Sequence, residues 1–278
     1  MYKIGKSSCD FELEEAIFDD LKKSGIDAIE VSLPQHKYKD FNYKAARAVA
    51  DKLGIELWSF HLQFAPFEYV NISSPDKLLR NQSIALLTEQ ICRGADIGID
   101  KFIIHPSGEP IDESVRDEHM KCSMDSLDKL AELAYRLGAT IAVENLPRTC
   151  LGNCADDMLK LLSANDKLRV CFDVNHLLND THKNFVEKVG DKIITLHISD
   201  YDFADERHWL PGEGKIDWLE LMDLLKKCNY SGVFMYEVAF NDQKTIVRER
   251  PLTATDFYNN AKTLFNGETP ISIGKPIV

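Results

Sequence analysis

The sequence lacks any hydrophobic run that could cross a membrane. No segment approaches the roughly 18 consecutive apolar residues of a membrane helix. The first residues, Met1 to Gly5, lead straight into a predicted strand instead of a signal peptide. The 7 cysteines show none of the spacings of a disulfide framework, which is typical of reduced thiols. These absences predict a cytoplasmic protein that does not associate with membranes.

Positive charge is also scarce. The chain has 33 Lys and Arg against 45 Asp and Glu, a formal net charge of −12. Binding to nucleic-acid phosphates needs clustered Lys and Arg, so the composition argues against a nucleic-acid partner. A glycine-rich phosphate loop after the first predicted strand is likewise missing, which argues against an open dinucleotide-binding sheet.

The sequence instead contains eight predicted strands that alternate with eight predicted helices. The strands are expected at residues 3–7, 28–33, 56–61, 101–105, 140–144, 169–173, 192–198 and 233–238. The helices are expected at residues 11–24, 43–53, 74–97, 112–137, 155–162, 183–189, 217–228 and 253–265, with Asp10 and Asp217 as N-caps. Residues 62–74 and 201–215 are long loops, and residues 266–278 are expected to form an irregular tail that packs over the rest. No composition break divides residues 1–278, so a single domain is expected.

Six of the predicted strands end in a side chain that can ligate a metal. These side chains are His61, His105, Glu144, Asp173, His197 and Glu237. The alternation alone fits either an open doubly wound sheet or a closed (β/α)8 TIM barrel, which typically needs about 250 residues. The carboxyl ends of the third to eighth predicted strands come together only if the sheet closes, so the pattern favours the barrel. Burying this much charge without a cation would cost many kcal/mol, so the rim is expected to hold a divalent metal.

Two further histidines lie in the loops that follow these strands. His176 comes three residues after Asp173, and His208 lies in the long loop before residue 217. Taken singly, a histidine at such a position is more often a solvated loop residue than a functional one. Their place beside the six strand-end residues makes them candidates for the same site.

Several motifs carry a resemblance to a known family. They are Val143-Glu144-Asn145, Phe172-Asp173-Val174-Asn175-His176, Leu196-His197-Ile198-Ser199-Asp200, Arg207-His208, the stretch Pro211-Gly212-Glu213-Gly214-Lys215-Ile216-Asp217-Trp218, and Tyr236-Glu237. Together they resemble the xylose isomerase-like TIM-barrel superfamily, from about the second strand to Glu237. That group contains sugar phosphate isomerases, ketose 3-epimerases, inosose dehydratases and endonuclease IV.

The epimerase branch of this superfamily implies one divalent metal ion, Mn, Zn or Co. The resemblance places its ligands at Glu144, Asp173, His197 and Glu237. It implies that Glu144 and Glu237 are also the catalytic acid and base. His176 and Arg207 would contact the substrate.

The endonuclease IV branch uses three zinc ions, and its extra ligands are also nearly all present. The resemblance maps them onto His61, His105, His208 and either Glu206 or Asp205, where that branch has an aspartate. A second metal is therefore possible. In a single-metal site His61, His105 and His208 would instead bind substrate.

The resemblance implies a metal-dependent isomerase or epimerase of a small sugar or sugar phosphate, acting by proton transfer through a metal-bound enediolate. The alternatives are a zinc-dependent phosphodiesterase like endonuclease IV, a lyase like inosose dehydratase, and a barrel that only binds. Arg148, Arg207 and Lys215 are the cations that could meet a phosphate, although surface charge is their simplest role. The expected partner is a small molecule, without nucleic acid or membrane, and a homo-oligomer is compatible with the sequence.

Overall fold

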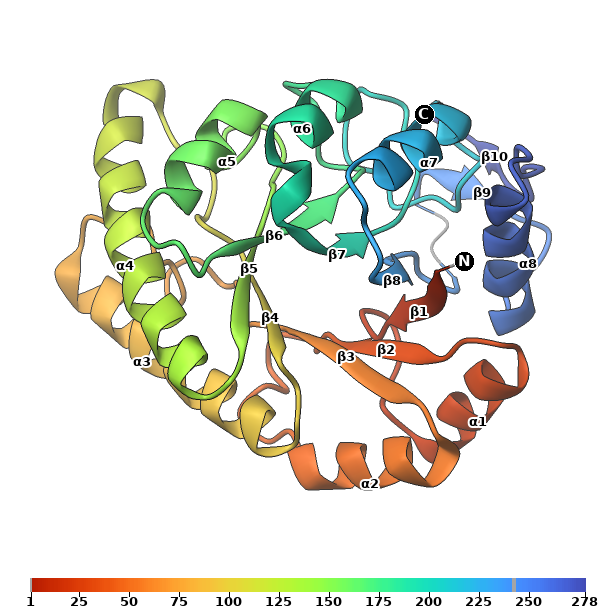
Figure 1. The fold of residues 1–278 in the computed structure, drawn as a ribbon, viewed down its shortest axis with the longest axis horizontal. Coiled ribbons are helices and arrows are strands. Elements are labelled where there is room, and N and C mark those ends of the chain that lie inside the picture. Colours follow the sequence, from red (N-terminus) through yellow and green to blue (C-terminus); the bar gives the residue numbers. More distant parts are fainter. Residues whose placement is uncertain (1, 242–243) are drawn as a thin grey trace.

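A computed structural model describes residues 2–241 and 244–278 of the chain. Its central feature is a ring of eight parallel strands with helices around the outside (Figure 1). The strands are β1 (Lys3–Ser7), β2 (Ala28–Val31), β3 (Glu56–His61), β4 (Lys101–Ile104), β5 (Thr140–Glu144), β6 (Arg169–Asp173), β7 (Ile193–His197) and β8 (Val233–Tyr236). The helices are α1 (Glu15–Lys23), α2 (Tyr43–Leu53), α3 (Lys77–Asp96), α4 (Arg116–Arg136), α5 (Ala155–Leu162), α6 (His182–Val189), α7 (Trp218–Lys227) and α8 (Ala254–Phe265). The expected TIM barrel is confirmed.

The sheet closes between β7 and β8. The strand order runs β7-β6-β5-β4-β3-β2-β1-β8, and Ile198, just after β7, bridges to Tyr236 in β8. The Ile198 N–H donates to the Met235 carbonyl at 2.8 Å, and the Glu237 N–H donates to the Ile198 carbonyl at 3.1 Å. Because all eight strands are parallel, closure brings their carboxyl ends to one rim.

Each strand buries both of its faces. On β4, Phe102 and Ile104 belong to the main core between the strands and the helices, whereas Ile103 packs with Ala142 and Cys171 in a separate cluster. Successive side chains of a strand point to opposite faces, so the second cluster lies inside the barrel. This two-sided burial is why the strands read as continuous apolar runs in the sequence.

Two register shifts interrupt the regular pairing of the barrel. One lies between Ile29 and Glu30 where β2 pairs with β3, and the other lies between Val170 and Cys171 where β6 pairs with β7. Such bulges change which side chains of a strand share a face with the neighbouring strand. Both occur on strands that carry site residues toward the rim.

Five of the eight α-helices start at a residue whose side chain caps the first turn. Side chains of Asn42, Asp76, Thr181, Asp217 and Thr253 accept hydrogen bonds from the first turns of α2, α3, α6, α7 and α8. Asp10 does not cap α1, which begins at Glu15 and not at residue 11. The Asp10 carboxylate instead accepts hydrogen bonds from Lys6 Nζ and from the Phe240 N–H.

The C-terminal tail is more ordered than the sequence indicated. Lys275–Pro276 (β10) pairs antiparallel with Ile246–Val247 (β9), against the expectation of no regular structure over residues 266–278. The Gly274 N–H also donates to Glu213 Oε1 at 2.7 Å. The tail is thereby tied to the loop between β7 and α7. Among the described residues, no helix is long and apolar enough to span a bilayer.

The N-cap of α8 provides a test of the fold. Thr253 and Asp256 form a reciprocal capping box. Replacing Thr253 by Ala should lower the free energy of unfolding by about 1 kcal/mol, because the first turn loses a side-chain acceptor. Urea unfolding measures the change. Thr263→Ala, inside the same helix, is the matched control and should be neutral or slightly stabilising, since Ala is the better helix former. Equal losses in both variants would contradict the role of the cap.

Candidate active site

Four side chains meet where β5, β6, β7 and β8 end. They are Glu144, Asp173, His197 and Glu237, and one ligand atom of each lies within 4.8 Å of those of the other three. His197 Nδ1 lies 3.1 Å from Glu144 Oε1 and 3.2 Å from Glu237 Oε2. It lies 3.7 Å from Asp173 Oδ2. The four residues that the sequence suggested as metal ligands therefore share one point in space.

This cluster of four has the donor set of a divalent-metal site. Glu144, Asp173 and His197 are each at most 1% exposed. The buried oxygens Asp173 Oδ2 and Glu237 Oε2 have no hydrogen-bond partner among the described residues. Burial raises the pKa of Asp173, an effect that a cation beside its free oxygen would reverse. Three carboxylates and one imidazole suit ions such as Mn²⁺ or Zn²⁺, so these residues fit a divalent cation.

Two more groups with metal-ligand spacing adjoin this cluster, and another overlaps it through Glu144, Cys171 and His197. The two adjoining groups are His61, His105 and Glu144, and His176, Glu206 and His208. Nε2 of His61 and Nε2 of His105 each lie 3.2 Å from Glu144 Oε2. Glu144 thus joins the cluster of four to the pair of histidines, with one carboxylate oxygen facing each.

Three of the four histidines in the two adjoining groups are oriented by backbone carbonyls. Nδ1 lies 2.9 Å from the Leu62 carbonyl in His61 and 3.0 Å from the Asn145 carbonyl in His176. In His208, Nδ1 lies 3.2 Å from the Glu237 carbonyl. A carbonyl only accepts, so each Nδ1 carries the proton of that bond. Nε2 is the ring nitrogen that remains to meet other groups, and it faces Glu144 in His61 and Glu206 in His176.

Histidine neighbours keep carboxylates of the site ionised in spite of burial. Burial raises the pKa of Glu144, but His197 and His105 outweigh it and hold that pKa well below its usual range. Burial also raises the pKa of Glu206, yet its hydrogen bond to His176 brings the value down to about 2. Ionised carboxylates are the form that binds a cation.

A cavity of about 220 Å³ opens above the cluster. Its lining includes His61, His105, Glu144, His176, Glu206, His208 and Glu237, together with Phe64, Phe67, Ser107, Glu109, Leu146, Pro147, Arg148 and Cys150. The ring of Phe64 stacks on His105 with centroids 4.2 Å apart. Drug-sized ligands generally occupy about 300–1,000 Å³, so this space matches a smaller molecule.

Of the two arginines considered from the sequence, Arg148 lines the cavity and Arg207 does not. Arg207 pairs with Asp202 inside its own loop at 3.1 Å and does not line the cavity. Arg148 does line it, and its guanidinium binds Glu109, Asp205 and Glu206. Arg148 also has a φ of 52°, which is rare for a residue other than glycine. The assignment of Arg207 to substrate binding has no support in this geometry.

Three buried polar residues support the site. Asn145 links β5 to β6, because its side chain both donates to the Asp173 carbonyl and accepts from the Asp173 N–H, each at 2.8 Å. The Asn175 N–H donates to Asp173 Oδ1 at 2.7 Å. Glu30 in β2 lies 3.1 Å from His197 Nε2 through Oε2. Sequence reasoning missed Glu30, although a charged residue inside the short apolar strand Ala28–Val31 was a signal.

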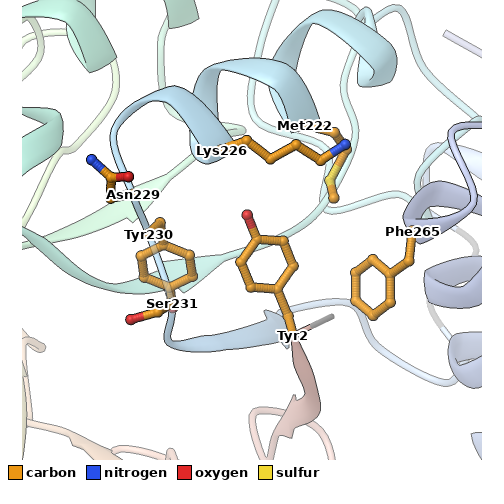
Figure 2. A pocket seen from close by; sticks show the side chains of 7 residues that line it. All are labelled: Tyr2, Met222, Lys226, Asn229, Tyr230, Ser231 and Phe265. Atoms are coloured by element: carbon orange, nitrogen blue, oxygen red, sulfur yellow. The ribbon is translucent and has the colours of Figure 1, made fainter.

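The opposite end of the barrel carries a larger hollow of about 590 Å³ (Figure 2). It is lined by Tyr2, Met222, Lys226, Asn229, Tyr230, Ser231 and Phe265. These residues lie near the start of β1, the ends of α7 and α8, and the turn before β8. Of these lining residues only Lys226 is charged, and none belongs to a group that could hold a metal. In TIM barrels this amino-terminal face contributes to stability, whereas the carboxyl-terminal face carries active sites.

Comparison with known proteins agrees with this geometry. The chain is 27% identical over 250 residues to protein MJ1311 of Methanocaldococcus jannaschii, covering 84% of this chain and 83% of that one. It is 26% identical over 232 residues to a D-psicose 3-epimerase of Ruminiclostridium cellulolyticum, covering 77% and 74%. A crystal structure of a D-tagatose 3-epimerase-like protein superposes with a TM-score of 0.79 over 95% of this chain and 97% of that one. At 23% identity, that last likeness shows the fold.

A family model adds the decisive comparison. The model described as xylose isomerase-like TIM barrel matches residues 18–253, a range that contains every residue of the groups described above. The chain belongs to the xylose isomerase-like TIM-barrel family.

Proposed function

We propose that the chain is a divalent-metal-dependent isomerase or epimerase of a small sugar. The placement of Glu144 and Glu237 carries this proposal. Their carboxylates reach one point from β5 and from the end of β8, 3.1 and 3.2 Å from His197 Nδ1, and both line the small cavity. Two carboxylates around one carbon are what proton removal and proton return require. The similarity to a D-psicose 3-epimerase supports the same chemistry.

Glu144, Asp173, His197 and Glu237 would hold the metal. When bound, the ion would polarise a sugar carbonyl and lower the pKa of the adjacent C–H group. Asp173 and His197 are fully buried and so act as ligands alone. Glu144 and Glu237 also line the cavity and can reach the substrate.

The proton steps follow from these positions. One of the two glutamates removes the proton next to the carbonyl and leaves an enediolate. The other returns a proton to the opposite face of the same carbon, or to the neighbouring carbon, which gives an epimer or an isomer. The imidazoles of His61 and His176 line the cavity and can hydrogen-bond with sugar hydroxyls, and Phe64 can cover an apolar edge of the sugar.

The charges at the cavity favour a sugar without a phosphate. Among the described residues that line the cavity, Arg148 is the one Lys or Arg. Three carboxylates, those of Glu109, Asp205 and Glu206, already bind its guanidinium. An incoming phosphate would have to displace them against like-charge repulsion, which disfavours its binding.

The metal assignment is tested by Asp173→Asn. This change should weaken Zn²⁺ binding by more than about 10-fold, because a ligand is lost, and loss of even an outer-shell partner has an effect of that size. Titration against a chromophoric chelator gives the affinity, and elemental analysis gives the metal content. Asp166→Asn, a change of an exposed carboxylate, is the matched control and should bind as the parent does. Parent-like affinity in Asp173→Asn would refute the centre.

The proton-transfer roles are tested by Glu144→Gln and Glu237→Gln. Each variant keeps an oxygen donor but loses its base, so turnover should fall at least about 10²-fold. Exchange of solvent deuterium into ketoses, followed by mass spectrometry, reports the proton step. Metal content must be measured in parallel, and Glu268→Gln at the exposed end of the chain is the control. Exchange at the parent rate in both site variants would exclude these residues as the bases.

A second candidate function is hydrolysis of a phosphate ester or phosphodiester with more than one metal. The specific observation is that several ligand groups adjoin one another and that Glu144 is shared between the cluster of four and the group with His61 and His105. His61 and His105 direct Nε2 at the same Glu144 oxygen, as a second ion would require. The carboxylates around Arg148 oppose this function, because they repel a phosphodiester.

Abasic-site DNA separates the two candidates. With Zn²⁺ or Mn²⁺ supplied, the purified protein should not nick such DNA above background, because the cavity is small and its mouth is acidic. Gel electrophoresis of a labelled duplex measures nicking. The His61→Ala, His105→Ala double variant tells intrinsic activity from a contaminating nuclease. If the parent nicks the DNA and the double variant does not, the hydrolase function is favoured over the isomerase function.

A further inference from the structure

Glu30 is a buried carboxylate to which the proposed proton steps give no role. It is 0% exposed and lies in β2, the strand before the first of the histidine-bearing strands. Ser59 Oγ donates to Glu30 Oε2 at 2.8 Å, and His197 Nε2 lies 3.1 Å from the same oxygen and 3.0 Å from Oε1. A fully buried carboxylate is costly unless it is paired, so its partners indicate its purpose.

The barrel departs from regular pairing to place this carboxylate. On the N-terminal side of Glu30 the register pairs Ile29 with Leu57, and regular continuation would pair Glu30 with Trp58. The register shift instead pairs Glu30 with Ser59. Paired residues of neighbouring parallel strands share a face, so the bulge brings Ser59 beside Glu30 as a hydrogen-bond donor.

His197 lies between Glu30 and the four-residue cluster. Its Nε2 faces Glu30, and its Nδ1 faces Glu144 at 3.1 Å and Glu237 at 3.2 Å. A carboxylate that accepts the proton of one ring nitrogen fixes the tautomer and the ring angle, and leaves the other nitrogen bare. The nitrogen that this arrangement leaves for a cation is Nδ1, which points at the carboxylates of Glu144, Asp173 and Glu237.

We propose that Glu30 is a positioning residue for the metal ligand His197. It accepts the Nε2 proton and presents Nδ1 to the cation held with Glu144, Asp173 and Glu237. Glu30 itself contacts neither the cation nor the substrate. This inference rests on the proposed metal centre and adds to it a residue outside the ligand set. It accounts for the charge inside β2, for the register shift and for the Ser59 hydrogen bond.

Two substitutions separate positioning from a merely structural role. Glu30→Leu removes the acceptor and should lower Zn²⁺ affinity about 10- to 100-fold, the usual effect of losing an outer-shell partner. Glu30→Gln keeps one oxygen that can accept the proton, so its loss should be smaller. The metal-free Glu30→Leu protein should also lose stability, because removing one partner of a buried pair leaves His197 and the Ser59 hydroxyl without their acceptor.

Competition with a chelator gives the Zn²⁺ affinities, and thermal unfolding of the metal-free proteins gives their stability. Imidazole nitrogen NMR of the zinc-loaded proteins shows whether Nε2 of His197 carries the proton. Glu213→Gln is the matched control, because Glu213 is also a buried glutamate but binds Arg248 and the Gly274 N–H. It should reduce stability and leave Zn²⁺ affinity unchanged.

The outcomes are distinct. The positioning role is supported if Glu30→Leu binds Zn²⁺ most weakly, Glu30→Gln binds it less weakly and the parent binds it most tightly. The Nε2 proton signal of His197 should also change in Glu30→Leu. Parent-like affinity in both variants, or a loss of stability without a loss of affinity, overturns the positioning role. A parent protein that binds no Zn²⁺ instead removes the metal centre itself, and with it the basis of the inference.

Discussion

The structure of the site depends on the carboxylate of Glu144. One of its oxygens faces His197 at 3.1 Å, and the other faces His61 and His105 at 3.2 Å each. A buried carboxylate can keep its charge only with such partners. The burial of Asp173 and the approach of Glu237 add further negative charge at the same place, which makes a cation the natural complement of the cluster.

Buried hydrogen bonds tie the loop between β7 and α7, which carries further groups of the site. The loop that carries Glu206 and His208 begins at Asp200, whose side chain accepts hydrogen bonds from the Gly212 N–H and from Trp218 Nε1 at 2.8 Å each. The same loop is tied to the C-terminal tail through Glu213, as described above. The Asp200 carboxylate thereby connects distant parts of this loop, which brings His208 to the rim.

Much of this organisation was readable from the sequence, because it depends on local patterns. The strands were recognisable since each is buried on both faces, and several helix starts were marked by their capping residues. The six ligand-type side chains at the strand ends were recognisable because a parallel barrel converts equivalent positions in successive units into neighbours. The predicted boundaries of the elements were less accurate than their order. The start of α1 is an example, because Asp10 hydrogen-bonds with Lys6 and Phe240 and does not start a helix.

The sequence by itself thus determined the alternation of strands and helices and the identity of the ligand-type residues at the strand ends. Only the tertiary structure decided which groups face each other. It brought Arg148 and not Arg207 to the cavity, and it placed Glu30 behind His197 through a register shift in β2 and β3. Periodicity fixes the face on which a side chain lies, but the pairing of charges between distant strands depends on barrel closure and bulges, which no local pattern records.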